Sequence, residues 1–245
     1  MHLAFDANMP SGNGILLGMH SEGARTPVHF TADPCGGPEA LWFYFRLHTP
    51  DGSPCGPVRV ILEHALNLLC IFPPYRLEPV WRSDADDWNR LPAATPHTLP
   101  DGQVCLAWDM EIRAPRAEIA LCYPYGEAEL TGLADNIAWH RDAIGVSQGG
   151  TPLHRLASEY GDTGGTRPGI YALARQHAGE TPGAWALDGF LRQWHREGRS
   201  TGLCWAVPIA DADGVRCGYY GKDQFPHDLN RAWGNPPMRH ETLVI

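Results

Sequence analysis

The stretch from Pro168 to Trp194 constrains the fold most, because it combines a strand pattern, a polar loop and a helix start. Residues 169–174 (GIYALA) form a short apolar run bounded by Pro and Gly, which predicts a buried strand. Thr181-Pro182 marks a helix start, since proline is tolerated in the first turn, where no backbone donor is needed. The helix is expected to bury an apolar face formed by Ala186, Leu187, Phe190, Leu191 and Trp194.

Two side chains that can bind a metal, His177 and Glu180, lie where this strand ends and the helix begins. An imidazole and a carboxylate three residues apart can converge on one cation while the strand and the helix fix their directions. Such a pair also occurs by chance in many chains, and a zinc site needs more than two residues of the right type. The pair therefore indicates a metal site only in combination with other motifs.

Two such motifs lie downstream, at residues 211–215 (DADGV) and 227–233 (HDLNRAW). Together with residues 176–181 (QHAGET), they resemble the zinc carboxypeptidase family related to pancreatic carboxypeptidase A, and in particular its cytosolic-carboxypeptidase branch. The resemblance extends from about Tyr123 to the C-terminus. Residues 123–125 (YPY) also resemble the start of the catalytic domain in that branch.

The resemblance implies a role for each residue that matches a family motif. His177 and Glu180 match the first two zinc ligands, and Asp228 matches a carboxylate that orients the first ligand histidine. Asn230 and Arg231 match the pair that binds the C-terminal carboxylate of the substrate, here named the carboxylate clamp. A guanidinium suits that task because its planar fork can donate two parallel hydrogen bonds to a carboxylate. Outside such a motif, Arg231 would be interpreted as part of a surface ion pair.

The sequence departs from the family in two ways. The family arginine that polarises the scissile carbonyl falls here on Gly221, and we expect the neighbouring Lys222, the only lysine, to supply the missing positive charge as a catalytic residue. In the family, the third zinc ligand and the glutamate base come later than any match in this chain, which ends at Ile245. His240 is too close to the carboxylate clamp to match that ligand. We therefore expect the C-terminal part of the catalytic domain to be missing.

The residues before about 122 favour strands separated by turns. The best strand candidates are the apolar runs at 15–19, 41–48, 58–63, 104–109 and 117–121. Asp51-Gly52 lies between two of these runs and predicts a hairpin. Short strands at this density predict an all-β sandwich, which the cytosolic branch also carries ahead of its catalytic domain.

Two further groups in this region are interpreted as structural. The aromatic run at 42–45 (WFYF) is expected to place alternate side chains in the core rather than to form a ligand platform. His64, His97 and the aspartates at 84, 86 and 87 lie among prolines and polar residues, without the spacing of a metal-binding loop. We expect them to form solvated loops.

The residues from Tyr123 onward change to alternating helix and strand patterns. Residues 127–140 place Leu130, Leu133 and Ile137 at helical spacing, residues 144–147 and 153–158 predict paired strands, and residues 202–209 predict a buried strand. The pattern predicts part of an α/β domain, a mixed sheet with helices on both faces. We expect two domains, a β-sandwich at 1–122 and the N-terminal portion of a zinc carboxypeptidase catalytic domain at 123–245.

The composition excludes several other classes of protein. A formal net charge of -9 and a pI near 5.7 argue against binding to nucleic acid or to an anionic membrane surface. No apolar run approaches the roughly 20 residues that span a bilayer. The seven cysteines are scattered and contain no Cys-x-x-Cys pair, which favours reduced thiols and a cytoplasmic location.

The sequence thus predicts a zinc-dependent metallocarboxypeptidase that removes C-terminal amino acids from peptides or protein tails and is incomplete as this chain. The alternative is a non-catalytic module, either structural or binding peptide C-termini, that retains the carboxylate clamp. An amidase or esterase that uses the same metal also stays open. A partial sheet followed by the apolar residues 242–245 (TLVI) would leave an unpaired edge, so we expect association through it.

Overall fold

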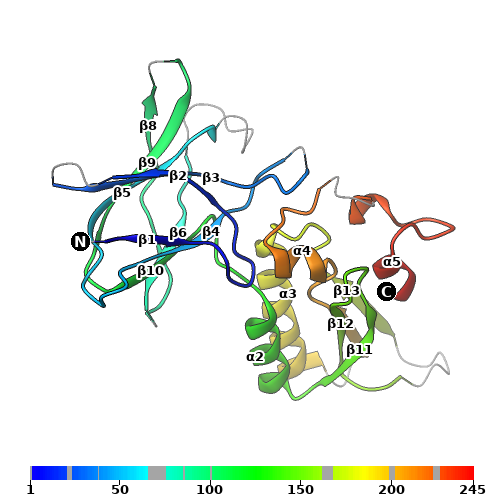
Figure 1. The fold of residues 1–245 in the computed structure, drawn as a ribbon. Coiled ribbons are helices and arrows are strands. Elements are labelled where there is room, and N and C mark those ends of the chain that lie inside the picture. The colour runs from blue at the N-terminus through cyan, green and yellow to red at the C-terminus, as the bar shows by residue number, and fades with distance from the viewer. Residues whose placement is uncertain are drawn as a thin grey trace. The chain divides into compact units, whose positions relative to one another are not determined.

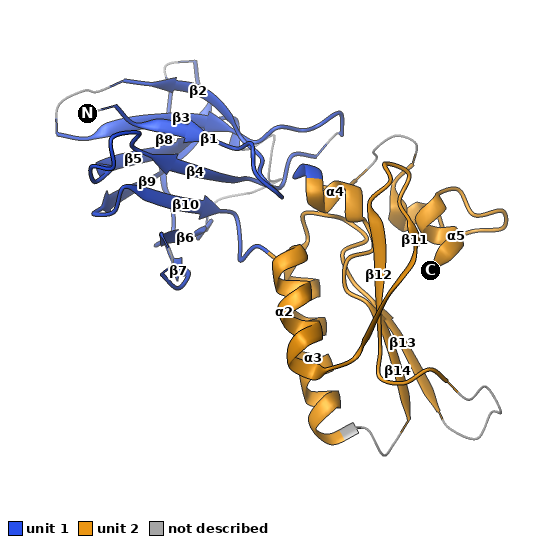
Figure 2. Ribbon diagram, turned by 60° about the horizontal axis from the view of Figure 1, so that its bottom comes forward, with its two compact units in different colours: residues 1–124, 217–219 blue, residues 125–216, 220–245 orange. Residues whose placement is uncertain are grey.

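The computed structural model describes residues 2–20, 24–37, 39–65, 76–84, 86–99, 101–161, 168–198, 202–222 and 227–245. The chain divides into two compact units (Figures 1 and 2). Unit 1 comprises residues 1–124 and 217–219, and unit 2 comprises residues 125–216 and 220–245. Within the described ranges, no helix is both long and apolar enough to cross a bilayer.

Unit 1 is built from two five-stranded sheets. The first has the strand order β1 (Ala4–Asp6), β4 (Tyr44–His48), β10 (Arg116–Ala120), β6 (Val80–Ser83) and β7 (Asn89–Arg90). The second has the order β2 (Ile15–Met19), β3 (Thr26–Thr31), β5 (Gly56–Leu62), β9 (Val104–Ile112) and β8 (Thr95–Thr98). Neighbouring strands are antiparallel except for the parallel pair β3 and β5.

Both sheets bury side chains in one hydrophobic cluster. Val58 and Val60 of β5 flank the exposed Arg59, which is the alternation expected for a strand with one buried face. The rings of Phe30 on β3 and Phe45 on β4, which belong to different sheets, lie 4.7 Å apart between centroids. The two sheets therefore share one core.

The predicted hairpin at Asp51-Gly52 is wrong. These residues do form a tight turn, in which Gly52 has a φ of +73° and Asp51 Oδ1 accepts a hydrogen bond from Ser53 N at 3.0 Å. The strands on either side, β4 and β5, belong to different sheets. Turn residues specify that the chain reverses, but the partner of each strand is decided by packing between residues far apart in sequence.

The aromatic run at residues 42–45 is buried along its whole length rather than alternately. Phe43 and Phe45 join the core of unit 1. The two polar rings find hydrogen-bond partners, since Trp42 Nε1 donates to Ser11 O at 2.8 Å and Tyr44 OH donates to a carboxylate oxygen of Glu118 at 2.9 Å. Burial on both faces is therefore possible without unsatisfied polar atoms.

Unit 2 contains a four-stranded mixed sheet with the order β11 (His140–Val146), β12 (Pro152–Ala157), β14 (Leu203–Val207) and β13 (Gly169–Leu173). The β13–β14 pair is parallel and the other pairs are antiparallel. In both ribbon views, α2 (Glu127–Ile137) and α3 (Thr181–Gln193) lie on one side of this sheet and α5 (His240–Val244) on the other (Figures 1 and 2). Three short helices complete the unit: η1 (Trp194–Gly198), α4 (Ala212–Cys217) and η2 (Leu229–Arg231).

The core of unit 2 confirms the predicted face of α2 and corrects two other expectations. Leu130, Leu133 and Ile137 are buried, as their spacing predicted. On α3 the buried residues include Ala184, Leu187 and Leu191, whereas Ala186 and Phe190 face solvent. Strand β13 is not buried either, because it lies at the edge of the described sheet and leaves Ile170 and Tyr171 40% and 42% exposed.

The described cysteines, Cys35, Cys55, Cys105, Cys122, Cys204 and Cys217, form no disulfide. Burial raises the pKa of the Cys55 and Cys204 thiols to about 11. Thiols with raised pKa are poor nucleophiles at neutral pH. The remaining cysteine, Cys70, lies outside the described residues.

Candidate metal centre and carboxylate clamp

The loop between β13 and α3, residues 174–180, carries both candidate metal ligands and is held by a buried arginine. Arg175 has a φ of +56°, in the left-handed region, and is 4% exposed. Its guanidinium donates to Tyr125 O at 2.6 Å and to Ala178 O. Sequence reasoning missed this role, because an arginine beside a polar loop is usually exposed.

Glu180 is the residue immediately before α3, which begins at Thr181 with proline in its first turn. A carboxylate at this end of a helix is favoured by the positive end of the helix dipole. The Glu180 side chain is half exposed, whereas His177 is only 6% exposed. One candidate ligand is therefore fixed by packing and the other is open to solvent.

Each imidazole nitrogen of His177 faces a carboxylate. Nδ1 lies 2.9 Å from Glu180 Oε1, and Nε2 lies 3.1 Å from Oδ1 of the buried Asp228. Asp228 precedes η2, and its Oδ1 also accepts a hydrogen bond from Asn230 N at 2.8 Å. When the ring carries its proton on Nε2, directed at Asp228, the Nδ1 lone pair can bind a cation that Glu180 also contacts.

This donor set fits part of a zinc site. Zinc binds imidazole nitrogen and carboxylate oxygen at about 2.0–2.2 Å, so two atoms on one ion are at most about 4.3 Å apart. His177 Nδ1 and Glu180 Oε1, at 2.9 Å, satisfy this limit. Within the described part of the chain, no three His, Cys, Asp or Glu side chains come close enough to hold a metal ion. The described residues therefore offer two ligands.

The carboxylate clamp, Asn230 and Arg231, follows Asp228 directly, and both of its side chains are exposed. Arg231 Nη1 donates to Asn230 O at 3.4 Å. Trp233 Nε1 donates to Gln176 Oε1 at 2.6 Å and so joins this segment to the residue before His177. Residues from two of the three sequence motifs thus meet at His177.

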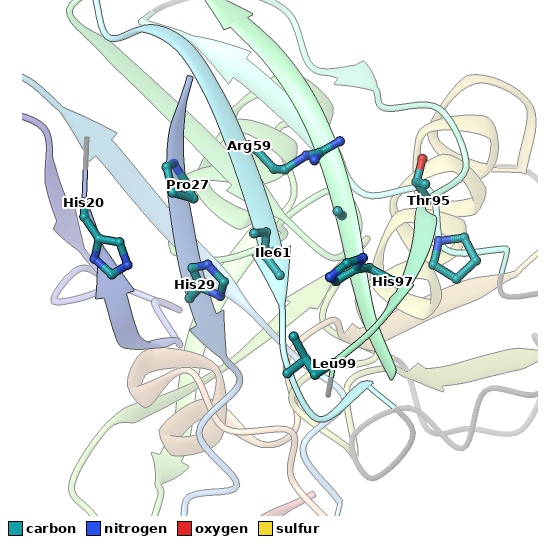
Figure 3. Close-up of a pocket in the computed structure, with 10 residues that line it drawn as sticks. His20, Pro27, His29, Arg59, Ile61, Thr95, His97 and Leu99 are labelled. Atoms are coloured by element: carbon teal, nitrogen blue, oxygen red, sulfur yellow. The ribbon is translucent and has the colours of Figure 1, made fainter. Parts of the chain in front are cut away.

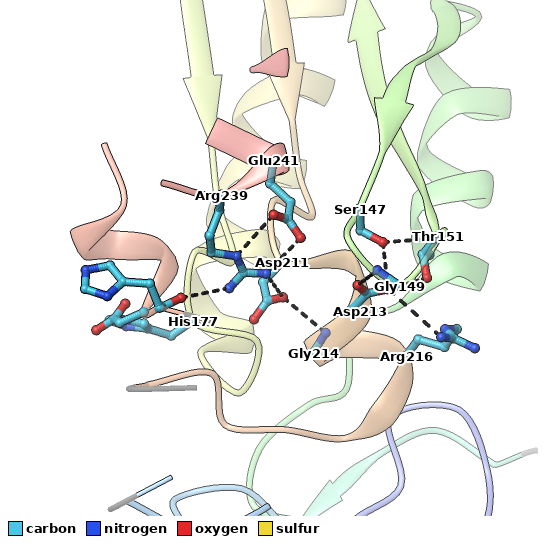
Figure 4. Close-up of polar contacts among 12 residues, drawn as sticks. Ser147, Gly149, Thr151, His177, Asp211, Asp213, Gly214, Arg216, Arg239 and Glu241 are labelled. Atoms are coloured by element: carbon cyan, nitrogen blue, oxygen red, sulfur yellow. Dashed lines mark hydrogen bonds and ion pairs between the residues drawn. The ribbon is translucent and has the colours of Figure 1, made fainter. Parts of the chain in front are cut away.

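The third motif, residues 211–215, has a structural place in unit 2. Although burial opposes its ionisation, Asp213 has a lowered pKa because Thr151 Oγ1, Ser147 Oγ and Gly149 N donate to it at 2.6 to 2.7 Å (Figure 4). These bonds join the turn between β11 and β12 to α4. Asp213 therefore acts here as a partly buried link between two elements.

A buried ion network lies in the same unit. Arg239 Nη2 is 2.8 Å from Glu241 Oε1 and 3.4 Å from Asp211 Oδ1, and Arg239 Nη1 donates to His227 O at 3.3 Å (Figure 4). One guanidinium therefore serves two buried carboxylates. Asp211 Oδ2 has no hydrogen-bond partner among the described residues. Burial raises the pKa of Asp211 to about 6, against the opposing charge of Arg239. His240, which follows Arg239 in the chain, begins α5 and is exposed.

Gly221, which the resemblance aligns with the missing arginine, packs against the loop that carries His177. Its φ is +105°, and a Cβ atom there would lie 2.5 Å from Ala178 N and 3.0 Å from His177 Cα. A side chain at position 221 would therefore displace the loop.

Lys222 Nζ lies 5.5 Å from the centroid of the Tyr220 ring, within cation–π range.

Unit 1 contains a pocket of about 330 Å³ on its second sheet (Figure 3). The imidazoles of His20, His29 and His97 line it, and His29 Nδ1 lies 2.7 Å from Glu63 Oε1. His97 is on β8 rather than in the predicted loop. The strands of His29 and His97 are separated by β5 and β9, and three strand spacings amount to about 14 Å. The three imidazoles therefore do not converge on one cation.

No protein-family model matches the chain. Cytosolic carboxypeptidase 6 of Homo sapiens is 27% identical over 267 residues, which cover 99% of this chain and 52% of that protein. The Mus musculus protein of the same name is 26% identical, over 99% of this chain and 48% of its own length. The chain thus spans about half the length of these curated relatives.

Solved structures share the fold. A metallo-carboxypeptidase from Burkholderia cenocepacia superposes with a TM-score of 0.78 at 22% identity, covering 100% of this chain and 66% of that one. A metallo-carboxypeptidase from Pseudomonas aeruginosa gives 0.75 at 19% identity, over 99% of this chain and 64% of its own. The chain is thus similar over nearly its whole length to cytosolic carboxypeptidases, and it shares the mixed-sheet fold of the solved metallo-carboxypeptidases.

Proposed function

We propose that this chain is the front portion of a zinc-dependent metallocarboxypeptidase that removes C-terminal amino acids from peptides or protein tails. The observation that supports the proposal most directly is the environment of His177. Its Nδ1 lies 2.9 Å from Glu180 Oε1 and its Nε2 lies 3.1 Å from Asp228 Oδ1, so one nitrogen is held by a buried carboxylate and the other faces a candidate ligand.

In this proposal, His177 and Glu180 hold the zinc and Asp228 orients the imidazole. Bound zinc would polarise the scissile carbonyl and lower the pKa of a bound water. The described residues offer two candidate ligands and no group of three ligand-type side chains. Because the chain spans about half the length of its curated relatives, we propose that a further ligand and the general base lie in a part of those longer proteins that this chain does not cover, or in a second chain.

The carboxylate clamp would select the substrate end. Asn230 and Arg231 are exposed beside Asp228, and the Arg231 guanidinium donates to a neutral carbonyl, Asn230 O, at 3.4 Å. An exposed arginine can donate two parallel hydrogen bonds to a terminal carboxylate, whereas an amidated terminus offers no such anion. Lys222 would add positive charge near the centre, in place of the arginine that Gly221 replaces.

We further infer that unit 1 corresponds to a β-sandwich ahead of the catalytic portion, with the domain boundary between residues 122 and 123. The shared core of its two sheets supports this interpretation. The names of the relatives support a cytoplasmic location. The exposed edge of β13 supports association with another strand.

The test is the zinc content of the purified 245-residue chain, beside two histidine variants. We expect the zinc to be lost in His177→Ala and retained in His97→Ala, which changes an exposed histidine of unit 1. Zinc that persists in His177→Ala would contradict the proposed metal centre.

Activity is tested separately, on a chain extended by the residues that complete the catalytic domain or mixed with the chain that supplies them. We expect hydrolysis of a peptide with a free C-terminus and none of its C-terminal amide, and we expect Arg231→Gln to raise KM. Tight binding of the free-acid peptide without hydrolysis would instead support the non-catalytic module.

A further inference from the structure

Tyr220 lies beside both candidate metal ligands, although no sequence motif identified it. Its carbonyl accepts a hydrogen bond from Gly179 N at 2.7 Å, so the backbone of residue 220 runs along the His177 loop. The adjacent Gly221 permits this close approach, because a Cβ atom there would lie 2.5 Å from Ala178 N. Backbone contacts therefore fix the position of Tyr220 independently of its side chain.

The side chain of Tyr220 contacts one candidate ligand with its ring and the other with its hydroxyl. The ring centroid lies 6.3 Å from that of the His177 imidazole, and the two planes are 23° apart. The hydroxyl donates to Glu180 Oε1 at 3.3 Å. This is the same oxygen that lies 2.9 Å from His177 Nδ1.

The hydrogen bond from the Tyr220 hydroxyl orients the Glu180 carboxylate. Its side chain is 50% exposed, so packing alone leaves it several rotamers. The hydroxyl holds the carboxylate toward His177 Nδ1 before a cation binds, and less rotamer freedom is then lost on binding. Groups that support metal ligands in this way typically change metal affinity 10–100-fold.

Lys222 contacts the same ring. Its Nζ lies 5.5 Å from the Tyr220 centroid, and a cation at this distance is attracted to the face of an aromatic ring. The contact favours the ring position in which the hydroxyl reaches Glu180. Lys222 therefore acts on the centre through Tyr220.

We propose that Tyr220 is a positioning residue that orients Glu180 for metal binding, an inference that rests on the proposed function of His177 and Glu180 as zinc ligands. The hydroxyl fixes the carboxylate, and the ring packs beside the imidazole. The two contributions can be separated, because phenylalanine keeps the ring and removes the hydroxyl.

The experiment is a double-mutant cycle on zinc affinity, measured by competition with a chelator. It uses the 245-residue chain, Tyr220→Phe, Glu180→Ala and the double variant. We expect Tyr220→Phe to weaken zinc binding about tenfold without lowering the melting temperature of the metal-free chain, and to have no further effect once Glu180 is alanine. Tyr171→Phe, which changes an exposed phenol on β13, should leave the affinity unchanged.

The possible outcomes separate the role of Tyr220 from the existence of the metal centre. Equal zinc affinity of Tyr220→Phe and the unsubstituted chain would overturn the inference and leave the metal centre in place. An equal loss with and without Glu180 would also overturn it, because the hydroxyl would then act elsewhere. If the unsubstituted chain binds no zinc, or if His177→Ala keeps it, the proposed function fails and this inference fails with it.

Discussion

Nε2 of His177 lies 3.1 Å from Oδ1 of Asp228, and both side chains are buried. In the proposed metal centre, the Asp228 carboxylate fixes the imidazole and increases its basicity, so the charge of Asp228 would contribute to metal affinity. We expect Asp228→Asn to weaken zinc binding 10–100-fold, because the amide keeps an acceptor but loses the charge. Chelator competition measures this, and an unchanged dissociation constant would show that Asp228 does not support the ligand.

Arg239 neutralises two buried carboxylates, Asp211 and Glu241. Arg239→Met removes the guanidinium and leaves both acids buried without a cation. We expect a loss of about 3–5 kcal/mol in the free energy of unfolding, measured by urea denaturation. The control is Arg216→Met, whose side chain is 59% exposed and pairs with Asp213 at 4.0 Å. The free energy of unfolding of Arg216→Met should fall by less than about 1 kcal/mol. Equal losses would contradict the importance of the buried network.

Asp211 makes stability depend on pH. Its pKa is raised by burial from 3.8 to about 6, so the folded state binds this proton more tightly than the unfolded state does. The stability that the folded protein gains from binding this proton is fully present below the unfolded pKa and is lost as pH rises through about 6. As pH rises from 4.5 to 7.5, a range that extends about one unit or more on either side of that pKa, the free energy of unfolding of Asp211→Asn should increase relative to that of the unsubstituted chain.

Asp213 offers the matched control, because its pKa is lowered. Its ionised form stabilises the fold above the unfolded pKa, and this contribution is lost as pH falls. Because the folded pKa lies below the ordinary value of 3.8, this contribution is already complete at pH 4.5. The stability difference between Asp213→Asn and the unsubstituted chain should therefore stay constant from pH 4.5 to pH 7.5. Urea denaturation across this range measures both variants, and a rise in the stability of Asp213→Asn that parallels that of Asp211→Asn would contradict the opposite assignments.

The sequence predicted those elements whose signal is local. The periodic leucines of α2, the paired strands β11 and β12, and the helix start at Thr181 were recognisable because each depends on neighbouring residues. The separation of β4 and β5 into two sheets was not, since strand partners depend on packing across the core. Likewise, the exposure of Phe190 and Tyr171 depends on which neighbours cover α3 and β13.

In the candidate site, too, residues within sequence motifs were predicted and residues placed by packing between distant segments were missed. His177, Glu180 and Asp228 were found through ordered motifs, and the structure brings them into contact. Arg175 and Tyr220 were missed, because their roles depend on a buried guanidinium and on a ring placed by a returning segment. Neither role has a spacing signature in one sequence.

Strand β13 has an exposed edge with two large apolar side chains, Ile170 and Tyr171. Such edges pair with strands of other chains. We expect the chain to self-associate with rising concentration and Ile170→Lys to reduce this association, measured by sedimentation velocity. Leu16→Lys, on the exposed edge strand β2 of unit 1, is the control. A larger effect of Leu16→Lys would place the association on unit 1.

The close packing of Gly221 also restricts how this chain can change over generations. With a Cβ 2.5 Å from Ala178 N, no single substitution can place an arginine at position 221 while the loop keeps its course. The loop would have to move first, and that move would disturb His177 before any benefit from the arginine appeared. Any side chain at position 221 therefore has to be accompanied by a compensating shift of the His177 loop, so this position tolerates change only together with its neighbours.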